Sequence, residues 1–167
     1  MFNHLNRIRK SVDYRAATIS GLTAGTVYIA TMEVVDPLIS DKNLNDLVLL
    51  GWPLVKDKNH AKLAGVAPHL VNSVAIALLY SAVGARRLPG PGWLRGLAFI
   101  SIETVGLYPT AVLENHHPAI QNGTLDRFWN WKAFWLSVPR HVAFGLTLGY
   151  VYDRLAKGRQ HVRDSNP

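Results

Sequence analysis

Four long apolar stretches constrain the fold of this chain more than any other feature of its sequence. They run over residues 16–39, 64–84, 93–113 and 133–152. Each has about 20 residues or slightly more, the length that a helix needs to cross about 30 Å of hydrocarbon. Four such stretches in 167 residues would be difficult to bury in a soluble core. The sequence therefore predicts an all-α integral membrane protein, a four-transmembrane-helix bundle that forms a single domain over residues 1–167.

The basic residues that flank these stretches predict the orientation of the bundle. Eleven basic and three acidic residues lie in the N-terminal segment, the turn after the second stretch and the C-terminal segment. On the opposite flanks, acidic residues nearly balance the basic ones. Because the cytoplasmic side carries the excess of lysine and arginine, we expect a multi-pass protein of a bacterial inner membrane with both termini cytoplasmic. The net charge of +7 is explained in this way, and no nucleic-acid partner is expected.

No motif in the sequence identifies a reaction. Cysteine is absent, which excludes disulfides, thiolate metal sites and iron–sulfur clusters. The chain has no phosphate-binding glycine loop, no G-x-S-x-G nucleophile motif, no dinucleotide fingerprint and no zinc-ligand spacing. No catalytic residue and no metal site are therefore predicted, and the chain is not expected to be an enzyme.

Residues that recur at one spacing indicate an internal repeat. Three identical pairs are each 72 residues apart: Pro37 and Pro109, His69 and His141, and Tyr80 and Tyr152. Small residues also match at this spacing. The bundle is therefore predicted to consist of two similar helical hairpins, in which the second and fourth stretches are equivalent.

Glycines spaced four residues apart predict where the helices pack. Gly21 and Gly25 lie in the first stretch, and Gly145 and Gly149 lie in the fourth. Residues at this spacing share one side of a helix, and small side chains let two helix backbones approach closely inside a membrane. These four glycines are predicted to form helix-packing seams.

Three carboxylates lie within the apolar stretches and need an explanation. Glu33 and Asp36 fall in the outer part of the first stretch, and Glu103 falls near the middle of the third. Ionisable groups in the membrane are costly, and they commonly mark ion or proton pathways. The alternative is that these groups hydrogen-bond one another or the backbone near prolines. Both interpretations stay open at this point.

His69 and His141 are the candidate cofactor ligands. Each begins an apolar stretch on the predicted outer side, and each is followed by small residues on the same helix face. Two equivalent imidazoles at one depth suit axial ligation of a haem or a chlorophyll-type pigment. The same small-residue face also suits simple helix packing, and the cofactor therefore remains unidentified at this stage.

The two predicted outer loops are rich in aromatic and apolar residues. Residues 43–55 end in a Gly-Trp-Pro sequence, and residues 126–135 read DRFWNWKAFW. Indole rings favour the headgroup boundary of a membrane. Both loops are therefore predicted to form short interfacial helices, with four anchoring side chains: Trp52, Trp129, Trp131 and Trp135. Residues 158–167 are expected to form a polar tail.

The pattern of the spans resembles the small bacterial four-span inner-membrane proteins of the YagU type. The resemblance depends on the sequence Gly21-Leu-Thr-Ala-Gly25 in the first span, and on a His-led, small-residue span ending in Tyr at His69–Tyr80 and His141–Tyr152. It covers the spans and not the loops. It implies the four-span fold and little chemistry.

The leading functional hypothesis is a non-catalytic accessory subunit of a larger membrane complex, in electron transfer or photosynthesis. It follows from the short chain, the absence of catalytic motifs and the aromatic outer loops. The expected partners are the lipid bilayer, including bound lipid, and other membrane-protein subunits. Two alternatives remain: a small proton- or ion-linked transporter that uses Glu103, and a haem- or pigment-binding protein that uses His69 and His141.

Overall fold

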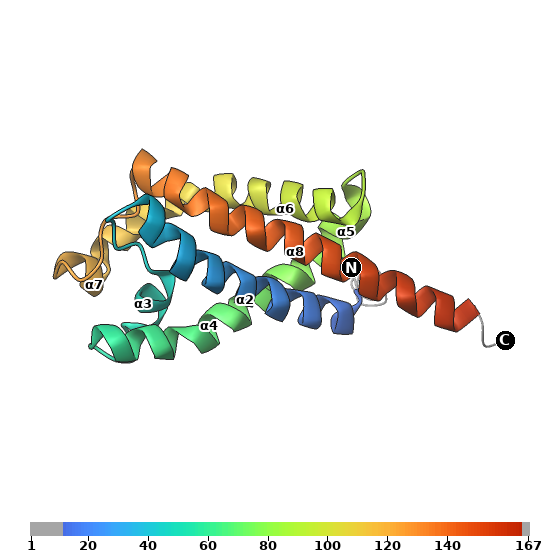
Figure 1. Cartoon of the computed structure of the whole chain (residues 1–167), viewed down its shortest axis with the longest axis horizontal. Helices are drawn as coiled ribbons and strands as arrows, with labels where there is room; N and C mark the ends of the chain where they lie inside the picture. Colours follow the sequence, from blue (N-terminus) through green and yellow to red (C-terminus); the bar gives the residue numbers. More distant parts are fainter. Residues whose placement is uncertain (1–11, 165–167) are drawn as a thin grey trace, which may run out of the picture.

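The computed structural model describes residues 12–164, and every regular element among them is helical. Four long helices make up the body: α2 (Tyr14–Ile39), α4 (Lys58–Leu79), α6 (Gly92–Leu107) and α8 (Trp131–Asp164). A π-helical turn, η1 (Tyr80–Gly84), and the short α5 (Ala85–Arg87) extend α4, and a 3₁₀ segment, η2 (Tyr108–His116), extends α6. The short helices α3 (Asp46–Gly51) and α7 (Pro118–Gln121) lie at the end of the bundle opposite α5 (Figure 1).

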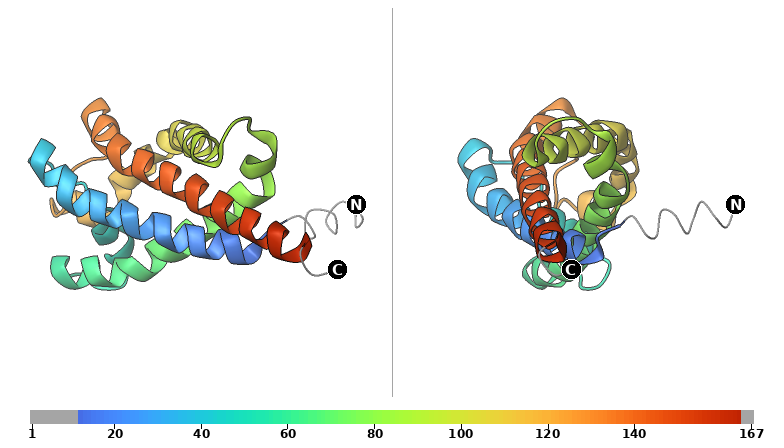
Figure 2. Two further views of the ribbon diagram at one scale, coloured as in Figure 1. Left: turned by 45° about the vertical axis from the view of Figure 1, so that its right-hand side comes forward. Right: turned by 90° about the vertical axis from the view of Figure 1, so that its right-hand side faces the viewer.

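The long helices form a curled row in the order α6, α8, α2, α4. Figure 1 shows α8 between α6 and α2, with α4 on the other side of α2. These neighbours pack along their lengths, whereas α6 meets the α4 segment chiefly at η1. Seen along the long axis, the row closes towards a ring in which α4 and α6 are the two ends (Figure 2).

Three of the helical segments are long and apolar enough to cross a membrane: Tyr14–Ile39, Lys58–Arg87 and Gly92–Glu114. In their most apolar windows only 22%, 28% and 17% of the residues are buried inside the protein. Most of their apolar side chains therefore point outward, as expected of helices surrounded by lipid rather than water. The prediction of an all-helical chain with helices able to cross a membrane is confirmed at this level, whereas the four-span bundle stays a prediction.

The predicted fourth span corresponds to α8, which is not among these three segments. Arg140 and His141 interrupt its apolar sequence in the N-terminal third of the helix. The helix nevertheless packs against both α2 and α6 along the bundle. The helix also continues to Asp164, so residues 158–164 of the predicted polar tail are helical, while residues 165–167 lie outside the described part.

Each helical hairpin is closed by a seam of small residues. Between α2 and α4, a Cβ atom added to Gly21 would lie 2.8 Å from the Ser73 carbonyl oxygen, and one added to Gly25 would lie 2.5 Å from Ser73 Oγ. Between α6 and α8, a Cβ atom added to Gly149 would lie 2.0 Å from the Gly92 carbonyl oxygen. Only glycine permits such backbone approach at these positions.

The two seams use corresponding positions of the two hairpins. On the α4 and α8 sides, Ser73 and Gly145 are 72 residues apart. On the α2 and α6 sides, the contacts are made by Gly21 and by Gly92, 71 residues further on. The predicted seam glycines therefore all lie at helix contacts, and the α6 partners Gly92 and Gly96 complete the pattern.

The two loop predictions need correction. Residues 43–55 contain a short helix, α3, as predicted, but it packs on α4, and Trp52 is buried instead of exposed. The reason is a close backbone contact, since a Cβ atom on Gly65 would lie 1.9 Å from the Leu47 carbonyl oxygen. Residues 126–130 form no helix, because the Asn130 side chain accepts a hydrogen bond from the Ala133 amide and starts α8 at Trp131.

Candidate functional site

A cavity of about 290 Å³ lies between α4 and α6, in the half of the bundle nearer α7. Its position follows from the helix order, because α4 and α6 are the two ends of the curled row and do not pack on each other here. An exact two-fold arrangement of the hairpins would pack α4 on α6 as α8 packs on α2. The cavity occupies the place of that missing contact.

A buried arginine and its partners form one wall of the cavity. Arg140 on α8 is 1% exposed, and its Nη1 atom lies 3.3 Å from Asp36 Oδ2 and 3.6 Å from Asp46 Oδ1. The same nitrogen donates to the Leu44 carbonyl oxygen at 2.9 Å. Its guanidinium also lies 5.6 Å from the centre of the Tyr28 ring. A charged side chain within an apolar helix is stabilised by such partners.

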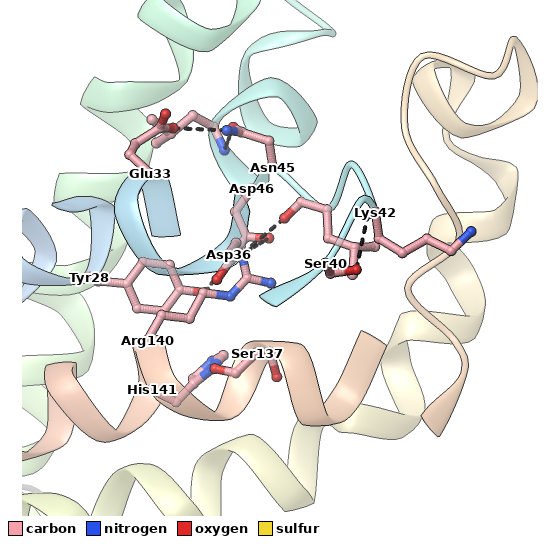
Figure 3. A network of polar contacts seen from close by, with 12 residues as sticks. Tyr28, Glu33, Asp36, Ser40, Lys42, Asn45, Asp46, Ser137, Arg140 and His141 are labelled. Atoms are coloured by element: carbon pink, nitrogen blue, oxygen red, sulfur yellow. Dashed lines mark hydrogen bonds and ion pairs between the residues drawn. The ribbon is translucent and has the colours of Figure 1, made fainter. Parts of the chain in front are cut away.

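Tyr28 joins this cluster to the two histidines. Its hydroxyl donates a hydrogen bond to the Asp46 carboxylate (Figure 3). Its ring centre lies 5.0 Å from that of His69 and 5.2 Å from that of His141. The structure therefore brings the two predicted cofactor ligands to one place. It also places Tyr28 against both rings, so a single haem ligated by both histidines would have to displace it.

The hydrogen bonds of the two histidines determine which of their ring nitrogens is left as an acceptor. His141 Nδ1 lies 2.8 Å from the Ser137 carbonyl oxygen, which can only accept, so Nδ1 carries the proton and Nε2 is an acceptor in the neutral ring. The backbone of Gly25 faces the His69 ring. His69 is 7% exposed, and its Nε2 atom has no partner.

The three predicted intramembrane carboxylates lie in three different environments. Glu33 pairs with Lys62 and accepts a hydrogen bond from Asn45 at 2.9 Å, away from the cavity. Asp36 belongs to the Arg140 cluster. Glu103 lines the cavity, and within residues 12–164 no cation pairs with it.

Unpartnered polar atoms are concentrated around the cavity. Four lining residues each have a buried polar atom without a hydrogen-bond partner: His69 Nε2, Thr104 Oγ1, Glu114 Oε2 and Arg140 Nε. Leaving such a group unpaired costs about 1–3 kcal/mol. An occupant that pairs with several of them would therefore be bound favourably.

Several residues of this site had no role predicted from the sequence. Tyr28 and Asp46 lie outside the predicted site, and Thr104 gave no signal beyond its place in an apolar stretch. One signal was present in Arg140, because an isolated arginine in an apolar stretch requires carboxylate partners. Among the described residues, no three His, Asp or Glu side chains converge closely enough to hold a metal ion.

An aromatic cluster lies beside the cavity at the α7 end. The Tyr108 ring stacks on that of Trp129 with ring centres 5.0 Å apart, and its hydroxyl donates to the Asn130 carbonyl oxygen at 2.7 Å. Trp129, Trp131 and Trp135 are exposed. Of the four predicted anchors, these three have the exposure that an interfacial position requires.

The chain was also compared with known proteins. The model of a family of unknown function, DUF6789, matches residues 11–163. The chain belongs to this family. All residues of the cavity and of both helix seams lie in the part that matches DUF6789. No curated protein and no solved structure matches the chain significantly. The finer resemblance to YagU-type proteins stays a prediction.

Proposed function

We propose that this member of DUF6789 is a four-span membrane protein that binds a small amphipathic molecule from the lipid phase. The observation that carries the proposal is the set of buried, unpartnered polar atoms around the cavity between α4 and α6. Binding sites combine an apolar lining with a few convergent polar groups. This cavity has that composition inside an apolar bundle.

The apolar part of the lining gives the tail of such a molecule a path. Ile76 on α4 and Ile100 and Leu107 on α6 line the cavity, and Leu107 is also exposed on the outside of the bundle. A molecule dissolved in the bilayer would enter between α4 and α6 and place its polar head against the α8 wall. The volume of about 290 Å³ suits a head of one ring with part of a chain.

The burial of Arg140 supports a fourth span. The polar residues that reduce the hydropathy of α8 face its neighbours, where Arg140 is paired with two carboxylates. Exposed Trp129, Trp131 and Trp135 lie at the α7 end, and exposed Trp93 lies at the other end with Arg86, Arg87 and Lys157. Tryptophan at both boundaries and basic residues at the cytoplasmic one are typical of a spanning helix bundle. The proposed location is a bacterial inner membrane, with the α7 end outside.

Single cysteines test this topology cleanly, because the chain has none. We expect His60→Cys and Trp129→Cys to react with a membrane-impermeant maleimide added to intact cells. Pro89→Cys and Lys157→Cys should react only after the membrane is opened. If Lys157→Cys reacts from the outside as Trp129→Cys does, α8 does not span and the four-span proposal is wrong.

A filled cavity tests the binding function. Thr104→Phe places a ring in the cavity, whereas Ile102→Phe adds a similar ring on the exposed side of the same helix. After purification in mild detergent, native mass spectrometry should show a small molecule retained by the native protein and by Ile102→Phe. Thr104→Phe should lose it. Equal retention by both variants would place the molecule elsewhere and refute the assignment of the cavity.

The role of accessory subunit in electron transfer or photosynthesis stays a prediction. It concerns the proteins around the bundle, and stoichiometric co-purification of larger subunits would test it. A proton-linked function has one specific observation in its favour, since Glu103 lines the cavity without a cation partner in the described chain. Glu103→Gln should then abolish proton flux in proteoliposomes, and unchanged flux would exclude it.

A further inference from the structure

The polar groups of the cavity are unequally divided between donors and acceptors. The cationic Arg140 is already engaged, through its Nη1 atom, by Asp36, Asp46 and the Leu44 carbonyl, and its Nε donor is buried without a partner. An anionic head would therefore find no free positive charge, and it would meet two carboxylates beside the only arginine of the lining. The cavity selects against anions.

Acceptors make up most of the remaining groups. His69 Nε2 is buried and unpartnered, and His141 Nε2 is an acceptor because Nδ1 donates to Ser137. Glu114 Oε2 is buried and unpartnered, and Glu103 lines the same cavity. A head that donates hydrogen bonds pairs with both imidazole Nε2 atoms, whereas a head that only accepts leaves them unsatisfied, and a carboxyl group keeps an acceptor oxygen in either protonation state.

The aromatic side chains of the lining favour a particular shape of head group. Four of them line the cavity: Tyr28, Tyr108, Phe128 and Phe144. Aromatic rings pack well on one another in offset or edge-to-face arrangements. A flat ring is therefore the head group that uses both the walls and the acceptors.

We infer that the cavity takes a lipid-soluble molecule whose head is an aromatic ring with two hydroxyl donors, the chemistry of a hydroquinone. The inference rests on the proposed binding function and specifies its ligand class. One hydroxyl would donate to the histidine side of the cavity and the other to the carboxyl side. The oxidised quinone has the same ring and tail but only acceptors, and it should bind more weakly.

A hydroquinone and the quinone formed from it share a ring and a tail, so comparing their binding isolates the effect of the two hydroxyl donors. The native protein in phosphatidylcholine nanodiscs is titrated, under anaerobic conditions, with a short-tailed hydroquinone and with its quinone, by calorimetry. We expect the hydroquinone to have a Kd about tenfold lower, as the loss of two hydrogen bonds implies. Glu114→Gln and His69→Phe should each reduce this preference, while Glu33→Gln, outside the cavity, should keep it.

The outcomes separate this inference from the proposed function. Equal or tighter binding of the quinone would overturn the donor-head inference and leave the binding function standing. Tighter binding of a primary alkylamine of equal tail length would overturn the hydroquinone assignment in the same way. Failure of every probe, with no molecule retained through purification, would overturn both. If His69→Phe does not fold, as judged by its elution profile, the Glu114→Gln result decides.

Discussion

Replacement of Arg140 by methionine tests the role of the charged cluster most directly. Methionine keeps the length and apolar packing of the side chain but removes the cation. Asp36, Asp46 and the Leu44 carbonyl oxygen all lose their shared partner, and Tyr28 loses the guanidinium over its ring. Nothing else in the described structure replaces this cation.

The expected loss in the free energy of unfolding follows from how deeply the partners of Arg140 are buried. Removing one member of a buried ion pair costs about 3–5 kcal/mol, because the remaining charge is left uncompensated. The Asp36 and Asp46 side chains are 14% and 21% exposed, and this partial exposure lowers the cost towards about 3 kcal/mol. The unpaired Leu44 carbonyl adds roughly 1 kcal/mol. We therefore expect Arg140→Met to lower the free energy of unfolding by about 4 kcal/mol.

Unfolding by sodium dodecyl sulfate in mixed micelles, followed by circular dichroism, measures this free energy. The matched control is Lys132→Met on the same helix, where the cation is 60% exposed and lies 3.8 Å from Asp41, and its expected cost is below about 1 kcal/mol. Combining Arg140→Met with Asp36→Asn and Asp46→Asn should recover most of the loss. A loss of less than about 1 kcal/mol for Arg140→Met alone would refute the view that this cluster holds α2, α3 and α8 together.

Two further predictions concern the seams and the loops. Gly149→Ala should destabilise the protein by about 1–3 kcal/mol, because its Cβ would lie 2.0 Å from the Gly92 carbonyl oxygen. The control is Gly106→Ala on α6, whose Cβ meets nothing within 4 Å. This control should be neutral or stabilising in the same assay. The Asn43 amide and the Lys42 ammonium lower the pKa of Asp126. The ionised Asp126 carboxylate therefore stabilises the folded protein above about pH 4, and this stabilisation is lost as the pH falls through the lowered pKa. Thermal unfolding of Asp126→Asn should accordingly depend less on pH in this acidic range than that of the native protein, and an unchanged slope would contradict the assignment.

The parts of the fold that depend on local pattern were predictable from the sequence. Length and hydropathy located the apolar helices, and the spacing of Gly21 and Gly25 located one seam, because both properties are set within a single helix. The beginning of α8 at Trp131 was missed, since the pattern of aromatic residues obscured the cap that Asn130 provides. The burial of Trp52 was missed because it depends on α3 packing on α4, a contact between segments.

The candidate site was only partly predictable for the same physical reason. His69, His141 and Glu103 attracted attention as polar residues in apolar stretches, and all three line one cavity. The grouping of the two histidines around Tyr28 depends on how the two hairpins pack. Asp46 begins the short helix α3, where an acidic residue is unremarkable until its contact with Arg140 is known.

Each of the two helical segments that border the opening of the cavity, α4 and α6 with its extension η2, contains a proline. Pro68 lies inside α4, one residue before His69, and Pro109 lies at the start of η2, just beyond α6. A proline removes one backbone hydrogen bond from a helix and so makes it easier to bend at that place. Pro37 and Pro139 lie inside α2 and α8 as well, but the contact between those two helices includes the ion pair of Arg140 with Asp36. We therefore expect the opening to widen by bending of its two walls, so that a bulky molecule passes without separation of the hairpins.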